Sequence, residues 1–156
     1  MSSLKKYKFK KIAVYGGSFN PIHIGHLLTG FDAIEQLGYD YILYVTTNIP
    51  VHKDFSEGVA SYDRFKMVNL AIKHYEKFLS SDIEIKRGGP TYTFDTITEL
   101  YKKYNFTNKL GVIFGDDLLD GLSTWKEIDK LQKIADLICL KRGQNENNCS
   151  KYRIKY

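Results

Sequence analysis

The segment YGGSFNPIHIGHLLT, residues 15–29, gathers residue types that suit phosphate chemistry. Gly16 and Gly17 follow a short apolar run, and glycine lets backbone N–H groups approach an anion closely. His23 and His26 lie around the start of an apolar helix, where unpaired amides and the positive end of the helix dipole attract negative charge. The spacing therefore predicts a site for chemistry on a phosphate group.

Two other interpretations of the histidines stay open from the residues alone. Either side chain could simply cap or pack the helix that is expected to begin near Gly25. His23, His26 and His52 could also bind a metal ion, but their spacing is no zinc motif and no fixed fourth ligand is present. The favoured prediction remains phosphate binding, with no metal bound by protein side chains.

The elements that would position this site alternate along the chain. Five short apolar runs have strand length, at 12–15, 41–45, 83–85, 110–114 and 136–140. Between them, apolar stripes with helical spacing run over 27–37, 62–75 and 94–104. Gly38 suits the end of the first helix, while Ser61 and Thr93 suit the N-caps of the next two.

This repeated strand–helix pattern predicts an α/β fold, a Rossmann-like, doubly wound parallel sheet of five strands. Ligands of such sheets gather beyond the carboxyl ends of the strands. Four loops are expected to converge there, with the sequences GGSFNPIHIGH, TTNIPVHK, RGGPTYT and GDD.

Composition is typical of one domain, which we place at 12–142, after a basic N-terminal tail that includes the start of strand one (1–11) and before a polar C-terminal tail (143–156). Five N-terminal lysines equal the net charge of +5, so the rest of the chain balances. We therefore expect no nucleic-acid partner. No apolar run reaches membrane-spanning length, and the two cysteines form no CxxC pair, which favours a cytoplasmic protein without a membrane partner.

The first loop matches neither G-x-G-x-x-G nor the Walker pattern. It matches the signature G-[TS]-F-[DN]-P-x-H-x-G-H of nucleotidyltransferases, and the chain resembles the bacterial nicotinate-nucleotide adenylyltransferase family in particular. Three weaker motifs agree with that resemblance: Pro50 to Lys53 for the family's P-P-H-K, Pro90 to Thr93 for P-x-Y-T, and Gly115, Asp117 and Trp125 for G-x-D followed by tryptophan. The resemblance covers roughly residues 10 to 142.

The resemblance implies transfer of AMP from ATP to nicotinate mononucleotide, giving nicotinate adenine dinucleotide and pyrophosphate for NAD biosynthesis. The acceptor phosphate would attack directly, so the protein needs no nucleophile and acts by positioning and charge neutralisation. Mg²⁺ is implied as an ion carried by the ATP phosphates. Nicotinamide mononucleotide, or another phosphorylated acceptor, is the alternative substrate.

The resemblance also implies roles for individual residues. His23 and His26 would be the catalytic pair on the ATP phosphates. The other ATP-binding residues would be Gly16, Gly17, Ser18, Phe19, Gly115 and Asp117, with Asp117 on a ribose and the ring of Phe19 used for packing. The mononucleotide would be held by Asn48, His52, Lys53, Tyr92, Thr93 and Trp125. Plainer roles stay open for the last two, a helix cap for Thr93 and a core anchor for Trp125.

Arg64 on the second helix could contact a substrate or form a local salt bridge, and the sequence assigns it neither role. Family members also carry an I-S-S-T-x-I-R element that grips the ATP phosphates, and the 156 residues do not contain it. The alternative function is therefore a truncated, catalytically impaired module that binds nucleotides.

Overall fold

The computed structural model describes residues 3–50, 58–140 and 154–155. Within these residues one parallel sheet has the strand order β4-β2-β1-β6-β7-β8, with a separate pair of two-residue strands. The main strands are β4 (Phe78–Ser81), β2 (Tyr41–Thr46), β1 (Ile12–Gly17), β6 (Leu110–Gly115), β7 (Ala135–Leu140) and the two-residue β8 (Ile154–Lys155). The predicted α/β parallel sheet is confirmed, with β8 extending its edge.

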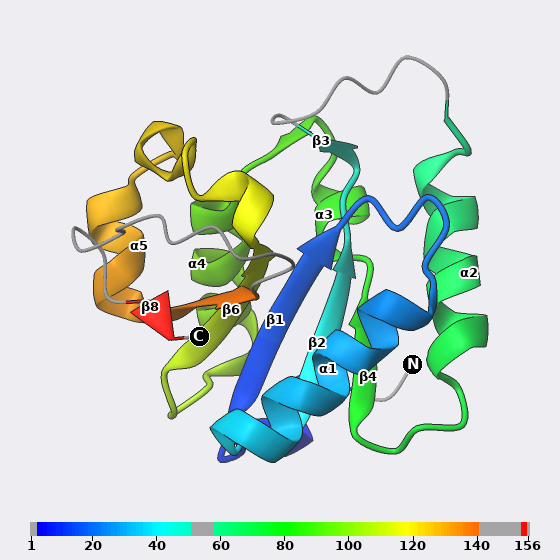
Figure 1. Ribbon diagram of the computed structural model, residues 1–156, viewed down its shortest axis with the longest axis horizontal. Coiled ribbons are helices and arrows are strands. Elements are labelled where there is room, and N and C mark those ends of the chain that lie inside the picture. Colours follow the sequence, from blue (N-terminus) through cyan, green and yellow to red (C-terminus); the bar gives the residue numbers. More distant parts are fainter. Residues whose placement is uncertain (1–2, 51–57, 141–153, 156) are drawn as a thin grey trace.

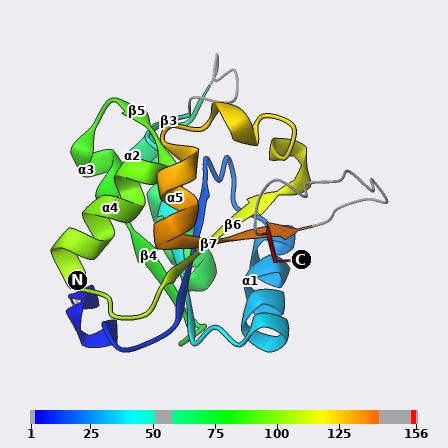
Figure 2. The same ribbon diagram turned by 90° about the vertical axis from the view of Figure 1, so that its left-hand side faces the viewer.

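Helices cover both faces of the sheet. Successive strand residues point to opposite sides, and both faces of the central strands carry apolar side chains that the helices bury. In β1, Ile12 and Val14 belong to one buried cluster while Ala13 and Tyr15 belong to the other. The helices are α1 (Ile24–Leu37), α2 (Ser61–Ile72), α3 (Ile83–Arg87), α4 (Thr93–Tyr104) and α5 (Ile128–Ile134). Figures 1 and 2 show α1 on one side of the sheet and α4 and α5 on the other.

The three predicted helical stripes correspond to α1, α2 and α4. Gly38 ends α1 in the left-handed conformation, with φ +72°, and its N–H donates to the Ala33 carbonyl, as its position predicts. The predicted caps are each displaced by one residue. Ser61 and Thr93 are the first helical residues, and the cap positions fall on Ala60 and Tyr92, neither of which makes a side-chain cap hydrogen bond.

The prediction of a strand at 83–85 is wrong, because those residues begin α3 and the strand is β4. Ile83 and Ile85 alternate with a polar residue and so imitate a strand, whereas the true strand contains two serines. Ser81 explains the break between the two elements, since its Oγ accepts the backbone N–H of Ile83 at 3.2 Å. An edge strand needs fewer apolar residues than a central one, which hides it from periodicity.

The basic segment before β1 is packed on the domain rather than detached from it. Residues Leu4–Tyr7 form a 3-10 helix with Leu4 buried, while Lys5, Lys6, Lys10 and Lys11 stay exposed. Most of the predicted C-terminal tail lies outside the described residues. In the part of the chain that the structure describes, no helix is long and apolar enough to cross a membrane.

The strand order fixes where a ligand can bind. β1 lies between β2 and β6, so the chain leaves β1 toward one side of the sheet and leaves β6 toward the other. Such a topological switch opens a crevice beyond the carboxyl ends of the two strands. The two short strands β3 (Ile49–Pro50) and β5 (Pro90–Thr91) pair in parallel near the same end of the sheet (Figure 2).

Candidate active site

A cavity of about 420 Å³ opens at the predicted crevice. That volume lies in the range of small-molecule sites, about 300 to 1,000 Å³. Ten of the predicted site residues line it: Gly16, Gly17, Ser18, Phe19, His23, His26, Thr93, Gly115, Asp117 and Trp125. Segments far apart in the sequence therefore meet around one cavity, and the loops after β1 and β6 both contribute.

The loop after β1 is held by an aromatic anchor. Phe19 is 2% exposed and its ring meets those of Tyr15 and His26 edge to face, with centroids 5.6 and 5.1 Å away. Its φ of +45° is uncommon for a side chain of this size. A Cβ on Gly17 would lie 3.1 Å from the same ring, so glycine allows the loop to fold back over it. The prediction that the ring of Phe19 packs is confirmed.

His23 and His26 form a reciprocal cap at the start of α1. Nδ1 of His23 accepts the Gly25 N–H at 3.1 Å, and Nδ1 of His26 accepts the His23 N–H at 3.0 Å. The two rings stack with centroids 3.8 Å apart and an interplanar angle of 27°. A Cβ on Gly25 would lie 2.9 Å from the His23 ring, so glycine is needed beneath it. Capping, one of the two interpretations left open, is therefore present.

This cap and the pocket position are compatible because an imidazole has two nitrogens. Nδ1 of each ring accepts a backbone N–H, so a neutral ring carries its proton on Nε2. Both residues also line the cavity. The cap thus fixes the tautomer that makes each histidine a hydrogen-bond donor through its outer nitrogen.

Another part of the cavity lining comes from α3, β5 and α4. It includes Thr91, Thr93, Thr96 and Glu84, and of these only Thr93 was predicted as a site residue. Glu84 is 5% exposed, and its Oε1 accepts the Thr96 hydroxyl at 2.7 Å. Burial raises the pKa of Glu84 to about 7, although the Thr96 hydrogen bond and the Arg87 charge oppose the rise.

Arg87 on α3 extends this polar cluster to the surface. Its guanidinium donates to Thr96 Oγ1 at 3.0 Å and pairs with Glu99 at 2.7 Å. The cluster therefore ties α3 to α4 just behind the cavity. Sequence reasoning missed Glu84, and the only signal for it was an acidic residue between two isoleucines.

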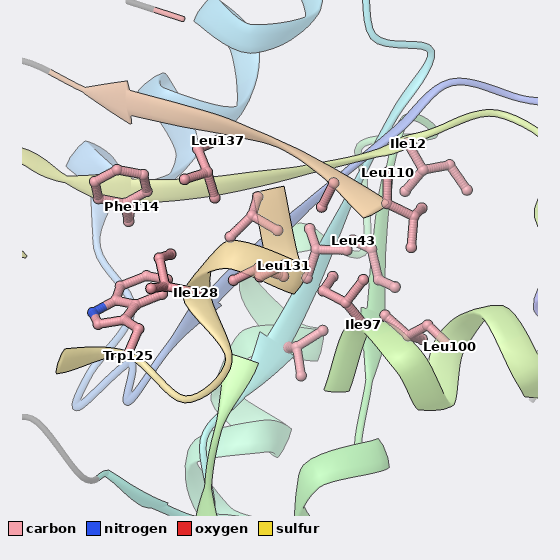
Figure 3. Packing of buried hydrophobic residues seen from close by; sticks show 14 of the residues in the cluster. Ile12, Leu43, Ile97, Leu100, Leu110, Phe114, Trp125, Ile128, Leu131 and Leu137 are labelled. Carbon is pink, nitrogen blue, oxygen red and sulfur yellow. The ribbon is translucent and has the colours of Figure 1, made fainter. Parts of the chain in front are cut away.

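Trp125 lies where the cavity wall meets the core. It is 7% exposed and packs edge to face on Phe114, with ring centroids 5.5 Å apart. Figure 3 shows its indole beside Phe114 and Ile128 in the buried cluster. The structural role left open for it is thus present, and the same side chain lines the cavity.

Asp117 follows β6, in the 3-10 helix Asp116–Leu118, with Gly115 in the preceding cap position. It is exposed on a cavity wall, which leaves its carboxylate accessible to a ligand. Among the described residues, no three His, Cys, Asp or Glu side chains gather as a metal-binding group.

Two predicted residues do not line the cavity. Asn48 instead donates through Nδ2 to the Gly89 carbonyl at 3.1 Å. Tyr92 is 37% exposed, and the ammonium of Lys126 lies 5.1 Å from its ring centroid. His52 and Lys53 lie outside the described residues, so their predicted roles remain predictions.

Arg64, left unassigned above, is almost wholly buried behind the loops. Its guanidinium donates to the carbonyls of Val59, Ser18 and Asn48 at 3.1, 2.5 and 3.1 Å. Burial lowers its pKa from the usual value. A local apolar pattern carries no signal for such a contact, because its acceptors are backbone oxygens of distant segments.

The chain is similar to known proteins both in sequence and in fold. Residues 14–154 match the family described as Cytidylyltransferase-like. A probable nicotinate-nucleotide adenylyltransferase of Borreliella afzelii is 36% identical over 146 residues, which cover 94% of this chain and 75% of the relative. The nicotinate-nucleotide adenylyltransferase of Bacillus subtilis is 37% identical over 133 residues, covering 85% and 70%.

A solved structure supports the fold. Plasmodium falciparum nicotinic acid mononucleotide adenylyltransferase, complexed with NaAD, superimposes with a TM-score of 0.76 at 22% identity, covering 94% of this chain and 73% of that one. From its sequence relatives, the chain belongs to the Cytidylyltransferase-like family and, within it, to the nicotinate-nucleotide adenylyltransferases.

Proposed function

We propose that this chain transfers the adenylyl group of ATP to nicotinate mononucleotide, producing nicotinate adenine dinucleotide and pyrophosphate. One observation carries the proposal. One cavity is lined both by the glycine loop with the histidine cap and by Thr93 and Trp125. A cavity with this combined lining suits a triphosphate beside a mononucleotide with an aromatic base.

The relatives support this choice of reaction. The two relatives described above, which match 94% and 85% of this chain, are named nicotinate-nucleotide adenylyltransferases. The Plasmodium falciparum enzyme has been solved with NaAD, the product of that transfer, and also with APC.

In the proposed step, a phosphate oxygen of the mononucleotide attacks the α-phosphorus of ATP. The new P–O bond joins the two nucleotides, while the bond between the α-phosphorus and the bridging oxygen breaks and pyrophosphate leaves with its electron pair. Negative charge then grows on the leaving group. Donors fixed in advance at that position stabilise the transition state more than the ground state.

The residues of the first loop are assigned to this charge. The Nε2–H groups of His23 and His26 donate to the phosphates, supported by the N-terminal amides of α1 and the loop amides of Gly17, Ser18 and Phe19. ATP enters as its magnesium complex, and the ion is carried by the phosphate oxygens. Its chemical contribution is to neutralise charge on the triphosphate.

The remaining assignments concern the nucleosides. Asp117 accepts hydrogen bonds from ribose hydroxyls of the adenylate, and Gly115 lets the backbone approach that sugar. Thr93 at the start of α4, with Tyr92 before it, binds the nicotinate carboxylate, since helix amides favour an anion there. Trp125 stacks on the pyridine ring, and His52 and Lys53 serve the mononucleotide phosphate, while Asn48 supports their loop through its hydrogen bond to Gly89.

The test is pyrophosphate release by the chain with ATP, Mg²⁺ and either nicotinate or nicotinamide mononucleotide. We expect activity that prefers nicotinate mononucleotide and that falls in His26→Ala. His74→Ala is the matched control, because His74 is exposed and lies away from the cavity lining. Binding of both substrates without turnover would favour the binding-only alternative, and absence of binding would overturn the site.

A further inference from the structure

Arg64 joins segments that are separate in the sequence. It lies in the first turns of α2 and is 1% exposed, so its charge is fully enclosed. Nη1 donates to the carbonyl of Ser18 in the loop after β1, and Nη2 donates to that of Asn48 in the loop after β2. Nε donates to Val59 just before the helix, which holds the guanidinium plane in place.

The contact continues beyond these two loops. The Asn48 side chain donates to the Gly89 carbonyl at 3.1 Å, next to the short strand β5. A backbone hydrogen bond from the Thr47 N–H to the Gly17 carbonyl, 2.9 Å long, joins the residues that precede these two acceptors, Asn48 and Ser18. One buried guanidinium therefore sits at the centre of a hydrogen-bonded connection between three loops at the cavity end of the sheet.

We propose that Arg64 is a positioning residue that sets the separation of the loop after β1 from the loop after β2. The proposal rests on the proposed function in one respect, that the first loop holds the ATP phosphates and the second serves the mononucleotide. Arg64 itself touches neither substrate. It acts by holding the two carbonyls at the fixed spacing of its guanidinium N–H groups.

The planar arrangement of the guanidinium donors explains why arginine is required at this position. Guanidinium presents donors in a rigid plane at separate positions, whereas the lysine ammonium concentrates its donors on one flexible nitrogen. Lysine at position 64 would keep the charge but could not satisfy both carbonyls in the same geometry. In-line attack is sensitive to such a change, since a displacement of about 1 Å can cost about 100-fold in rate.

The first arm of the test measures loop order directly. Amide hydrogen exchange is compared in the wild-type chain, Arg64→Lys and Val68→Ala, with attention to residues 17–19 and 47–49. Val68 lies one turn further along α2 and is fully buried, so its truncation loosens the same helix but removes none of the side-chain hydrogen bonds to the two loops. We expect exchange in both loops to rise about tenfold in Arg64→Lys alone, the change that corresponds to one net hydrogen bond.

The second arm measures pyrophosphate release and the separate affinities for ATP and nicotinate mononucleotide. We expect kcat to fall about 100-fold in Arg64→Lys, with each affinity changed less than about threefold. Val68→Ala is expected to keep kcat near the wild-type value, even if its melting temperature falls as much as that of Arg64→Lys.

The outcomes separate the two proposals. Unchanged exchange in the two loops would overturn the positioning role, as would faster exchange with an unchanged kcat or an equal loss of kcat in Val68→Ala. If the wild-type chain releases no pyrophosphate with any acceptor, the proposed function fails. The exchange arm still decides in that case whether Arg64 holds the loops together.

Discussion

The cavity lining has two parts that are built in different ways, and we call them the histidine end and the assembled end. In the histidine end, the glycine loop and both histidines come from one continuous segment, and His23 and His26 bond within a single helix turn. In the assembled end, Glu84, Thr93 and Trp125 come from three separate segments that meet only through the fold. A group of site residues that are adjacent in the sequence can be recognised as a motif. A group brought together by tertiary packing depends on the hydrophobic core for its geometry.

This difference predicts the largest effect on stability at the assembled end. Trp125→Ala should lower the free energy of unfolding by about 3 to 5 kcal/mol, because it leaves a cavity beside Phe114. Trp125→Phe should retain most of that free energy and mainly raise KM for the mononucleotide. Denaturant unfolding and steady-state kinetics check both variants. An alanine variant with wild-type stability would show that this wall is not part of the core.

At the histidine end we expect a large loss of activity with a small loss of stability. His26→Ala should lower kcat about 100- to 1,000-fold, the usual effect of removing one donor to developing charge. The lost cap should cost about 0.5 to 2 kcal/mol.

His26→Gln separates the two effects at this position. Glutamine is the usual partner in a capping box and can accept the His23 N–H. We therefore expect a melting temperature near that of the wild type and a kcat still at least about tenfold low. Full activity in the glutamine variant would mean that the cap, and not the imidazole, is what catalysis needs.

The buried carboxyl at the assembled end predicts a dependence of stability on pH. The pKa of Glu84 is raised from 4.5 to about 7, so its contribution is fully present below pH 4.5 and is lost as pH rises through 7. The loss should reach about 3 kcal/mol. Glu84→Gln removes the titrating group and can still accept from Thr96.

Unfolding free energies at pH 5 and pH 8 test this prediction. The wild-type chain should lose more stability between the two values than Glu84→Gln. Equal losses in the two chains would show that Glu84 titrates close to its ordinary pKa. Asp63→Asn on the exposed start of α2 serves as a carboxyl control.

The smallest effect is expected far from the cavity. Gly38 has φ +72° at the end of α1, and an alanine there would be strained although nothing lies within 4 Å of its Cβ. Gly38→Ala should cost about 1 kcal/mol of unfolding free energy and leave kcat unchanged. A changed kcat would link the far end of α1 to the histidine cap at its start.

Sequence predicted the fold class, and it predicted that the glycine loop and the two histidines lie together, because the signals for both are local. Strand and helix periods, the glycine pair and the Gly38 terminus each depend on residues within a few positions of one another. The failures are equally specific. The edge strand β4 was missed because serines break its apolar pattern. The two predicted N-caps differ from the observed cap positions by one residue, which is the usual uncertainty of a helix end.

The amino-acid sequence by itself determined the alternation of strands and helices, the glycine loop and the two histidines one turn apart. These follow from backbone preferences and side-chain spacing, which act over short distances. Tertiary structure alone decided that Glu84 is buried beside Thr96, that Trp125 serves both core and cavity, and that Arg64 spans two loops. Those contacts join residues distant in the chain, often through backbone carbonyls that every residue possesses, so no residue type marks them in advance.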